Sequence, residues 1–237
     1  MKETVAAGQF RYAGSELTRF EKALNWKAYW RSRIGDFVGG DVLEVGAGIG
    51  ANTRLLSRLW YRNWVCLEPD PELIRYIELP PGGRHQKAEG SIEDLPEEER
   101  FDTILYIDVL EHIRDDRQEL IRAKRRLRPG GNLIVLSPAW PFLFSPFDRA
   151  IGHYRRYTRE SLRAAAPTGI EERRVVYLDS AGLLASAGNR LLLRSRMPAE
   201  KQILTWDRVL VPVSRVIDGW LGWRVGKTVL GIWQLPR

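Results

Sequence analysis

The sequence predicts an α/β fold in which a mostly parallel sheet carries helices on both faces. Apolar runs lie within residues 41–50, 64–70 and 101–113, and they alternate with segments whose apolar residues recur at helical spacing. This alternation is typical of parallel sheets, whose strands are buried on both sides. The chain has 237 residues, of which 44% are hydrophobic and 28% charged, as expected for a globular protein with one such domain.

The first predicted strand ends in a glycine-rich turn, D-V-L-E-V-G-A-G-I-G at residues 41–50. Gly46, Gly48 and Gly50 have no Cβ, so the backbone can adopt a positive φ or approach a ligand closely. Glu44 places a carboxylate just before the first glycine, and leucines at helical spacing follow the turn. The segment therefore predicts a strand, a cradle for a nucleotide and a helix. Taken alone, it also fits the looser dinucleotide fingerprint.

The second predicted strand, W-V-C-L-E-P-D at residues 64–70, ends at Glu68. This acid lies about twenty residues past the turn, where α/β nucleotide-binding folds place a carboxylate that accepts both ribose hydroxyls. It does not distinguish between classes of nucleotide cofactor.

Two further segments make that distinction. F-D-T-I-L-Y-I-D-V-L-E-H-I at 101–113 predicts a strand that runs into a loop, and R-L-R-P-G-G-N-L-I-V-L-S-P at 126–138 predicts a helix end, a turn and a strand. With the first two motifs, their order and spacing resemble the class I S-adenosylmethionine-dependent methyltransferases. The resemblance implies a Rossmann-like sheet of seven strands with the last one antiparallel. A short-chain dehydrogenase should carry Tyr-x-x-x-Lys, which the sequence lacks, so a nicotinamide enzyme is disfavoured.

The resemblance implies S-adenosylmethionine as the cofactor and indicates the residues that bind it. Glu44 would orient the methionine ammonium, and Glu68 would hold the ribose. The segment G-S-I-E-D-L-P at 90–96 would lie along the adenine; many relatives have Asp where this chain has Ser91, so a following acidic residue or the backbone of Ile92 is the alternative contact. The predicted cofactor-binding residues are Glu44, Gly46, Ala47, Gly48, Gly50, Asn52, Glu68, Pro69, Ser91, Ile92, Tyr106, Ile107, Asp108 and His112.

Methyl transfer from a sulfonium needs a base only where the acceptor is poorly ionised, as a hydroxyl is. Histidine is the usual base at neutral pH. His153, in I-G-H-Y-R-R-Y-T, follows the fifth strand on the expected acceptor side, and His112 lies in the V-L-E-H loop on the cofactor side. We predict His153 and His112 as catalytic residues, with a structural loop histidine and a helix cap as the respective alternatives. No metal site is predicted.

The acceptor is expected to be a small molecule. The segment S-P-A-W-P-F-L-F-S-P-F-D after the fifth strand places aromatic side chains at the carboxyl edge of the sheet, where α/β folds bind ligands. This favours an apolar, aromatic or glycolipid-like acceptor, and the family analogy favours transfer to oxygen. The alternatives are an RNA or DNA methyltransferase, a protein that binds S-adenosylmethionine without catalysis and, less favoured, an NAD-dependent oxidoreductase.

The sequence predicts four segments. Residues 1–40 carry helical patterning and are expected to form a lid or brace on the cofactor site, with an ordinary packing helix as the alternative. Residues 41–180 are expected to form the methyltransferase core. Residues 181–223 are a helical insertion, and residues 224–237 contain the final strand, over Lys227 to Gln234.

The insertion has an apolar helical face, with polar residues assigned to the opposite face. We favour a lid packed over the core, because the small apolar residues at 180–189 can pack closely and a lid would shield the sulfonium. An interfacial membrane helix, supported by its tryptophans and by basic residues such as Arg194, Arg196 and Lys201, and a dimer contact are the alternatives. The apolar residues are Ile203, Leu204, Trp206, Val209, Leu210, Val213, Val216, Ile217, Trp220 and Leu221; the polar ones are Asp207, Arg208, Arg215 and Asp218.

The formal net charge of +7 raises the question of nucleic acid. The basic cluster at 124–128 lies at a predicted helix C-terminus, where cations complement the helix dipole, and no RNA-binding module or N-P-P-Y tetrapeptide is present. Nucleic acid is therefore not the favoured partner. The single cysteine, Cys66, lies in a predicted buried strand, and no secretory signal opens the sequence. We expect a cytoplasmic protein, with peripheral contact at the inner membrane face through residues 203–221 as an option.

Overall fold

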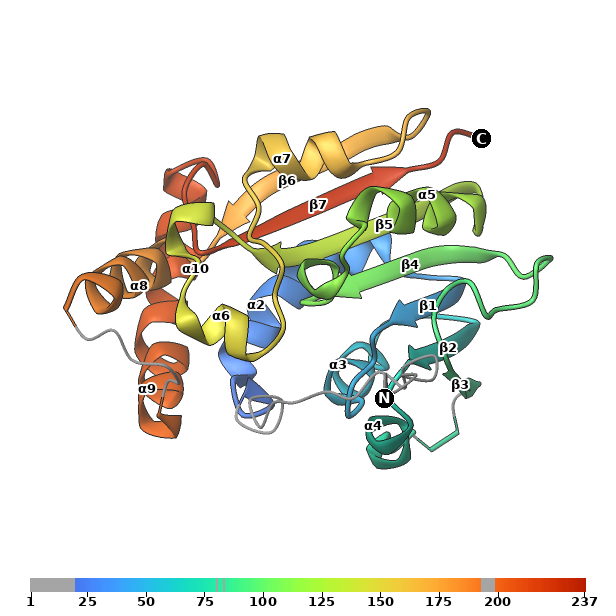
Figure 1. Ribbon diagram of the computed structural model, residues 1–237, viewed down its shortest axis with the longest axis horizontal. Helices are drawn as coiled ribbons and strands as arrows, with labels where there is room; N and C mark the ends of the chain where they lie inside the picture. The colour runs from blue at the N-terminus through green and yellow to red at the C-terminus, as the bar shows by residue number, and fades with distance from the viewer. Residues whose placement is uncertain (1–19, 80, 83, 193–198) are drawn as a thin grey trace, which may run out of the picture.

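A computed structural model describes residues 20–79, 81–82, 84–192 and 199–237. Its centre is a seven-stranded sheet in the order β3-β2-β1-β4-β5-β7-β6 (Figure 1). Every pairing is parallel except those of β7, which runs antiparallel to both β5 and β6. This confirms the predicted fold class. The strands are β1 (Asp41–Val45), β2 (Asn63–Glu68), β3 (His85–Glu89), β4 (Phe101–Ile107), β5 (Leu127–Pro138), β6 (Glu171–Leu178) and β7 (Thr228–Gln234).

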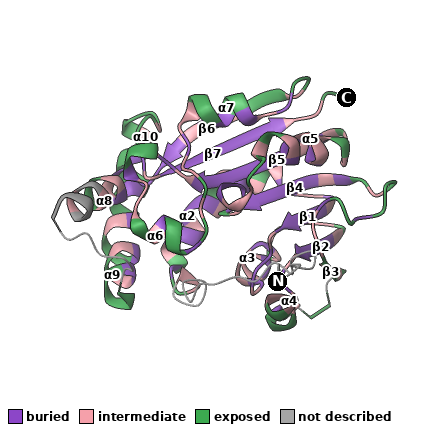
Figure 2. Cartoon of the chain, viewed as in Figure 1, coloured by how far each residue is buried: buried purple, intermediate pink, exposed green. Residues whose placement is uncertain are grey.

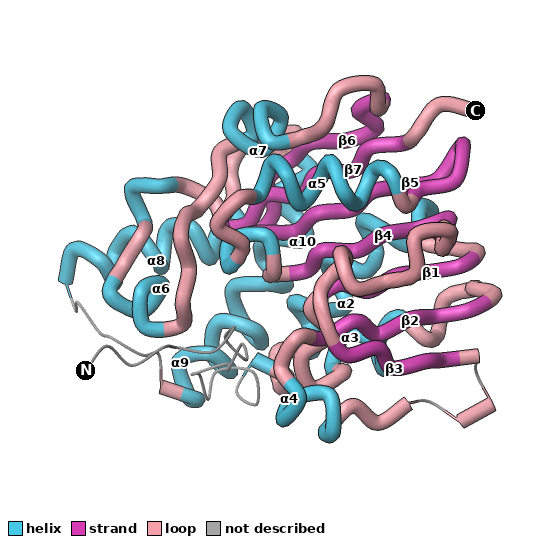
Figure 3. The backbone as a smooth tube through the Cα atoms, turned by 45° about the vertical axis from the view of Figure 1, so that its right-hand side comes forward, coloured by secondary structure: helices cyan, strands magenta, loops and turns pink. Residues whose placement is uncertain are grey.

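Helices cover both faces of the sheet, as the tube view shows (Figure 3). One core contains residues of α5 and α7, and the other contains residues of α2, α3, α9 and α10. The helices are α2 (Leu24–Ile34), α3 (Ala51–Leu56), α4 (Pro71–Tyr76), α5 (Asp116–Arg125), α6 (Pro146–Ala150), α7 (Arg159–Ala165), α8 (Ser180–Leu192), α9 (Glu200–Thr205) and α10 (Val211–Trp220). Short helical turns are η1 (Gly35–Phe37), η2 (Leu110–His112), η3 (Pro141–Leu143) and η4 (Trp206–Leu210).

Successive strand residues enter opposite cores, because side chains alternate along a strand. In β4, Ile104 and Tyr106 pack with one core, whereas Leu105 and Ile107 pack with the other. The central strands are therefore buried on both sides, whereas no residue of the edge strand β3 is buried and the edge strand β6 begins with exposed residues. Exposed residues also gather on the outer surfaces of the helices (Figure 2). Cys66 is fully buried in β2, as the sequence predicted.

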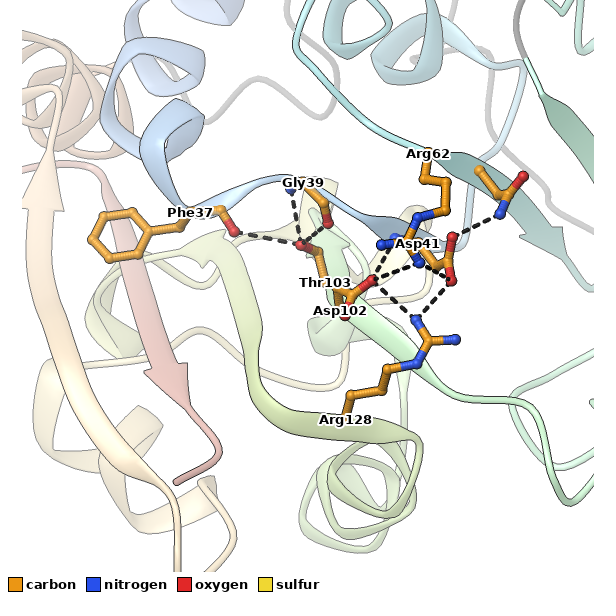
Figure 4. Close-up of polar contacts among 8 residues, drawn as sticks. Phe37, Gly39, Asp41, Arg62, Asp102, Thr103 and Arg128 are labelled. Atoms are coloured by element: carbon orange, nitrogen blue, oxygen red, sulfur yellow. Dashed lines mark hydrogen bonds and ion pairs between the residues drawn. The ribbon is translucent and has the colours of Figure 1, made fainter. Parts of the chain in front are cut away.

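A polar network holds the strands in register at the amino edge of the sheet (Figure 4). Arg128 donates to Asp41 at 2.7 Å and to Asp102 at 2.9 Å, which joins the beginnings of β1, β4 and β5. Thr103 Oγ1 accepts from the backbone N–H of Gly39 at 3.1 Å. The network lies at the opposite end of the strands from their carboxyl ends, so its role is structural.

The predicted insertion occupies the carboxyl edge of the sheet as α8, α9, η4 and α10 (Figure 1). Asp207 accepts from the backbone N–H groups of Asn25 and Trp26, at 3.2 and 2.8 Å, which satisfies the first turn of α2. Asp218 accepts from the Tyr29 hydroxyl at 2.7 Å. The insertion is thus attached to the N-terminal helix.

The division of the chain at residues 40, 180 and 223 stays a prediction.

The predicted orientation of this insertion was wrong in one respect. Asp207 and Asp218, assigned to the outer face, are buried, whereas Val216 and Trp220, assigned to the packed face, are exposed. The hydrogen bonds to α2 explain the difference, because they make burial of the two carboxylates favourable. Trp206 lies between these extremes, with its Nε1 donating to Asp179 at 2.7 Å. In the described parts of the chain, no helix is both long and apolar enough to cross a bilayer.

Candidate active site

The glycine-rich turn after β1 has the conformation that its sequence requires. Gly46, Gly48 and Gly50 have φ values of +66°, +57° and +74°, which L-residues with a Cβ rarely adopt. A Cβ at Gly46 would lie 2.6 Å from Val109 Cγ2, so the turn also needs the space that glycine leaves. The backbone N–H of Gly46 donates to the carbonyl of Leu67 at 2.8 Å, which ties the turn to the end of β2.

Glu44 is buried in β1 with one carboxylate oxygen satisfied and the other not. Its Oε2 accepts from Thr53 Oγ1 at 2.6 Å and from Trp64 Nε1 at 2.9 Å. Its Oε1 is buried and has no hydrogen-bond partner among the described residues. Burial raises the pKa of Glu44 to about 7, against the opposing effect of these two donors. A buried carboxylate oxygen without a partner is costly, so this position favours a cationic ligand group.

Glu68, at the end of β2, holds the glycine turn and the next helix together. Its Oε2 accepts from the backbone N–H of Gly48 at 2.7 Å, and its Oε1 accepts from that of Asp70 at 3.0 Å. Burial raises the pKa of Glu68, and these backbone donors oppose the rise. Each carboxylate oxygen can accept a second hydrogen bond. Pro69, which follows, and Asn52, at the start of α3, are both half-buried.

The segment predicted to lie along the adenine forms a tight turn after β3. Ser91 donates to Asp94 Oδ2 through its backbone N–H at 2.7 Å and its hydroxyl at 2.8 Å. These two donors lower the pKa of the exposed Asp94 carboxyl. Glu93 forms an ion pair with Arg122. The Ile92 side chain is buried in the core, so its backbone is the part that remains for a ligand.

The end of β4 limits how Tyr106 could contact the cofactor. The Tyr106 side chain points into the core, where its hydroxyl donates to Glu119 Oε1 at 2.8 Å, so its backbone is the part that remains for the predicted contact with the methionine end. The alternation of the strand is the reason, because the preceding and following residues face the other side. Ile107 is buried on that other side, in the core that contains Ala47.

Asp108, the next residue, leaves the strand with a φ of +57° and has an exposed side chain. Its pKa is nevertheless raised to about 6, because the surrounding protein excludes much of the water, while His153, Lys227 and Lys27 oppose the rise. Asp108 therefore lies close enough to His153, Lys227 and Lys27 for its carboxylate to interact with all three side chains.

His153 belongs to a hydrogen-bonded group that its sequence context did not predict. Its Nδ1 lies 3.0 Å from Asp148 Oδ1, and Asp148 is fully buried. Arg156 donates to both oxygens of Asp148, at 2.8 and 3.1 Å, and Ser145 donates to Oδ2 through its hydroxyl at 2.7 Å. These hydrogen bonds, with the charge of Arg156, hold the pKa of Asp148 well below its ordinary value despite its burial. Because ionised Asp148 only accepts, His153 donates to it through Nδ1, and Nε2 is the ring nitrogen left for another partner.

His153 Nε2 faces a second carboxylate. It lies 3.9 Å from Oε1 of the fully buried Glu111, and that oxygen has no hydrogen-bond partner among the described residues. Oε2 of Glu111 accepts from Ser137 Oγ at 2.9 Å. Burial, with the nearby Asp108 carboxylate, raises the pKa of Glu111 well above its ordinary value.

His112 lies beside His153, with the two ring centroids 4.5 Å apart. Burial and the neighbouring His153 lower the pKa of His112 to about 4, so it is neutral at physiological pH. One donor atom from each of Glu111, His112 and His153 lies within 4.8 Å of the others, a spacing at which a divalent cation could bind. Two histidines and one carboxylate are a ligand set found at metal centres.

The structure thus brings the two predicted histidines together and adds two acids that the sequence reasoning missed. Asp148 lies five residues before His153 in the S-P-F-D-R-A-I-G-H segment, and Glu111 is part of the V-L-E-H motif. The pattern Ser145-x-x-Asp148 is a capping box at the start of α6, which gave a local signal for a buried or bonded Asp.

Comparisons with known proteins show the family to which the chain belongs. Residues 18–168 match the methyltransferase domain family. A demethylmenaquinone methyltransferase from Tropheryma whipplei (strain Twist) is 33% identical over 138 residues, covering 55% of this chain and 56% of that protein. A ubiquinone biosynthesis O-methyltransferase from Xanthomonas oryzae pv. oryzae is 30% identical over 107 residues, covering 42% of this chain and 44% of that protein. The chain spans about half the length of these curated relatives.

The solved structures include the N-methyltransferase NodS from Bradyrhizobium japonicum in complex with S-adenosyl-L-homocysteine. It superposes with a TM-score of 0.61 at 15% identity and covers 95% of this chain and 94% of that chain, which shows a shared fold. The family match covers more than half of the chain, so the protein belongs to the methyltransferase domain family, and the class I S-adenosylmethionine-dependent methyltransferase resemblance is confirmed. Its cofactor is S-adenosylmethionine.

Proposed function

We propose that the protein transfers the methyl group of S-adenosylmethionine to a hydroxyl oxygen of a small apolar or aromatic acceptor, with His153 as the general base. The observation that carries this proposal is the hydrogen bond between His153 Nδ1 and the buried Asp148. A histidine oriented by a carboxylate on one nitrogen presents the other nitrogen for proton transfer.

The residues around the glycine turn fit the cofactor. The unpartnered Oε1 of Glu44 would receive the methionine ammonium, and Glu68 would accept hydrogen bonds from the ribose hydroxyls while it keeps those from the backbone. Gly46 would leave room for close approach, since a side chain there meets Val109. When bound, S-adenosylmethionine supplies a methyl group that is already activated by the positive charge of its sulfonium.

The proton of the acceptor hydroxyl would pass to His153 Nε2 as the new O–CH₃ bond forms. Asp148 then stabilises the imidazolium, because Arg156 and Ser145 keep its carboxylate ionised. The position of Nε2 next to Glu111 and His112 keeps the proton transfer within a group of residues that is largely shielded from water. Orientation and exclusion of water are the remaining contributions of the protein.

The acceptor class is supported by two features. Trp140, at the end of β5, stacks on Tyr177 at 4.6 Å between centroids, and the neighbouring Phe142 is exposed, so aromatic surface lies next to the carboxyl edge. In addition, the similarity to a ubiquinone biosynthesis O-methyltransferase favours an aromatic hydroxyl as the acceptor group. We therefore place phenols and hydroquinones first among the candidate acceptors.

The test is release of S-adenosylhomocysteine from a panel of phenols and hydroquinones by the wild type and by His153→Ala. We expect the variant to lose about 10²- to 10⁴-fold in rate, the usual contribution of a general base, while its affinity for S-adenosylmethionine is unchanged. The loss should shrink at high pH, where the acceptor hydroxyl ionises without a base.

His85→Ala is the matched control, because it removes a histidine at the amino end of β3, where its Nε2 contacts the Tyr61 hydroxyl at 2.9 Å. That variant should keep the wild-type rate. Full activity of His153→Ala on every methylated acceptor would show that His153 is not the base. Binding of S-adenosylmethionine without methylation of any acceptor in the panel would contradict the acceptor class.

A further inference from the structure

The outer face of α10 and of the turn before it carries an apolar stripe, made of Val209, Val213, Val216 and Trp220. Their exposed fractions are 55%, 44%, 66% and 88%. The spacings of four, three and four residues place them along one side of a helix. Large apolar side chains that are exposed singly are ordinary, but a continuous row of them marks an interaction surface.

The opposite side of the same helix shows that this exposure is not a failure to pack. Asp207, Val211, Ser214 and Asp218 are buried at matching intervals. Ser214 Oγ donates to Asp179 Oδ1 at 2.7 Å, and Asp218 accepts from the backbone N–H of Asp179 at 2.7 Å. Polar contacts therefore hold the helix on the protein, and the apolar stripe is left for solvent or a partner.

Charge next to the stripe indicates which partner fits. Arg208, Arg215 and Arg224 are exposed, and Lys201 is exposed one helical segment earlier. None of the four forms an ion pair with any residue in the described ranges. Arginines without carboxylate partners beside a row of valines and a tryptophan match a surface that is anionic outside and apolar beneath. Arg194 and Arg196, which the sequence also associated with this function, lie outside the described residues.

A second copy of the chain fits this surface less well. The net charge of +7 and the exposed arginines around the stripe would bring like charges together in a symmetric dimer. An anionic bilayer surface has the complementary charge, and an exposed tryptophan is typical of the level at which headgroups meet acyl chains.

We propose that the protein docks on the surface of an anionic lipid bilayer through the apolar stripe of Val209, Val213, Val216 and Trp220, with Arg208, Arg215 and Arg224 contacting the headgroups. The helix would lie in the plane of the interface rather than cross it. Because the insertion lies at the carboxyl edge of the sheet, docking would bring the edge that carries the active site toward the bilayer (Figure 1). The inference holds whichever acceptor the enzyme uses.

The experiment is co-sedimentation of the full chain with vesicles of phosphatidylglycerol and phosphatidylcholine, compared with vesicles of phosphatidylcholine alone. The wild type should sediment with the anionic vesicles and much less with the neutral ones, and high salt should weaken the binding. The Val216→Ser/Trp220→Ser variant should lose about tenfold or more in partitioning, because both side chains are exposed and contribute apolar area only in the bound state.

Trp60→Ser is the matched control, since Trp60 is 74% exposed but lies before β2, away from the insertion. That variant should bind vesicles as the wild type does, and all variants should keep their melting temperature and their affinity for S-adenosylmethionine. Failure of the wild type to bind anionic vesicles would overturn the proposal. So would a dimer, detected by light scattering, that the Val216→Ser/Trp220→Ser variant disrupts while vesicle binding is unaffected.

Discussion

Replacing Glu44 by Gln should remove a pH dependence of cofactor binding that the structure predicts. Burial raises the pKa of Glu44 to about 7, and its Oε1 has no partner in the described part of the protein. In the proposed binding mode, only the ionised carboxylate of Glu44 would attract the ammonium of S-adenosylmethionine strongly, so the cofactor would compete with a proton at this site. The affinity of the wild type should therefore rise with pH up to about 7 and then level off.

The size of the effect follows from the pKa. A carboxylate with a pKa of about 7 is ionised in about 3% of molecules at about pH 5.5 and in about 75% at about pH 7.5. The affinity should rise about 25-fold over this window, which corresponds to about 2 kcal/mol. In Glu44→Gln the affinity should be weak and nearly constant.

The stability of the cofactor-free protein should change in the opposite direction. The folded-state pKa of Glu44 lies above the ordinary value of 4.5, so the contribution of this group to stability is complete below about pH 4.5 and is lost as the pH rises through about 7. Urea unfolding of the wild type and of Glu44→Gln, compared at both ends of the window, measures this difference.

Calorimetric titration with S-adenosylmethionine across the window is the binding assay. Asp108 is the necessary control, because the surrounding protein excludes water and raises its pKa to about 6, so it titrates in the same range. If ionisation of Glu44 causes the pH dependence, the affinity of Asp108→Asn for S-adenosylmethionine should still rise between about pH 6 and 7.5, by most of the wild-type amount. A wild-type affinity that does not change with pH would refute the reasoning. So would an equal rise of affinity with pH in Glu44→Gln.

The remaining predictions concern the turn, the ribose contact, the amino edge and the histidine cluster. Glu68→Ala should weaken S-adenosylmethionine binding by about 1.5 to 3 kcal/mol, the range for hydrogen bonds to a charged acceptor, and unchanged calorimetric affinity in a folded variant would remove Glu68 from the site. Gly46→Ala forces a Cβ against Val109 at a positive φ, and urea unfolding should show a loss of about 1 to 3 kcal/mol. Arg128→Ala should lower the unfolding free energy by about 1 kcal/mol with cofactor affinity unchanged, because the ion pairs that it breaks are partly exposed. Treatment with EDTA should leave the rate unchanged if His153 is the base; a loss that Mn²⁺ reverses would instead indicate a cation at this residue and its neighbours.

Local sequence determined the elements of the sheet and the glycine-rich turn after β1. Glu44 and Glu68 could be placed because strand ends are marked by apolar runs that stop at a turn, and parallel strands bring those ends to one edge. The three glycines of the turn were recognisable because the positive φ values are a local requirement of the backbone. The final strand was placed within one residue, at Thr228–Gln234 rather than Lys227–Gln234.

The group around His153 was decided by tertiary structure. Asp148 and Arg156 are near it in the sequence, but Glu111 comes from a different loop, 42 residues earlier, and the two meet only because β4 and β5 are neighbours in the sheet. The direction of the Tyr106 side chain likewise depended on which core each side of β4 faces. Pattern alone does not contain this information.

The insertion shows most clearly which features local sequence determines and which the tertiary structure decides. Helical periodicity identified an amphipathic segment, because spacing is a property of the chain itself. The choice of the buried face depended on hydrogen bonds from α2 and from the backbone of Asp179. These bonds stabilise the buried carboxylates of Asp207 and Asp218. The apolar face of a helix is the buried one unless the polar side chains of the opposite face find hydrogen-bond donors inside the protein. Whether such donors are present is decided by the folded structure.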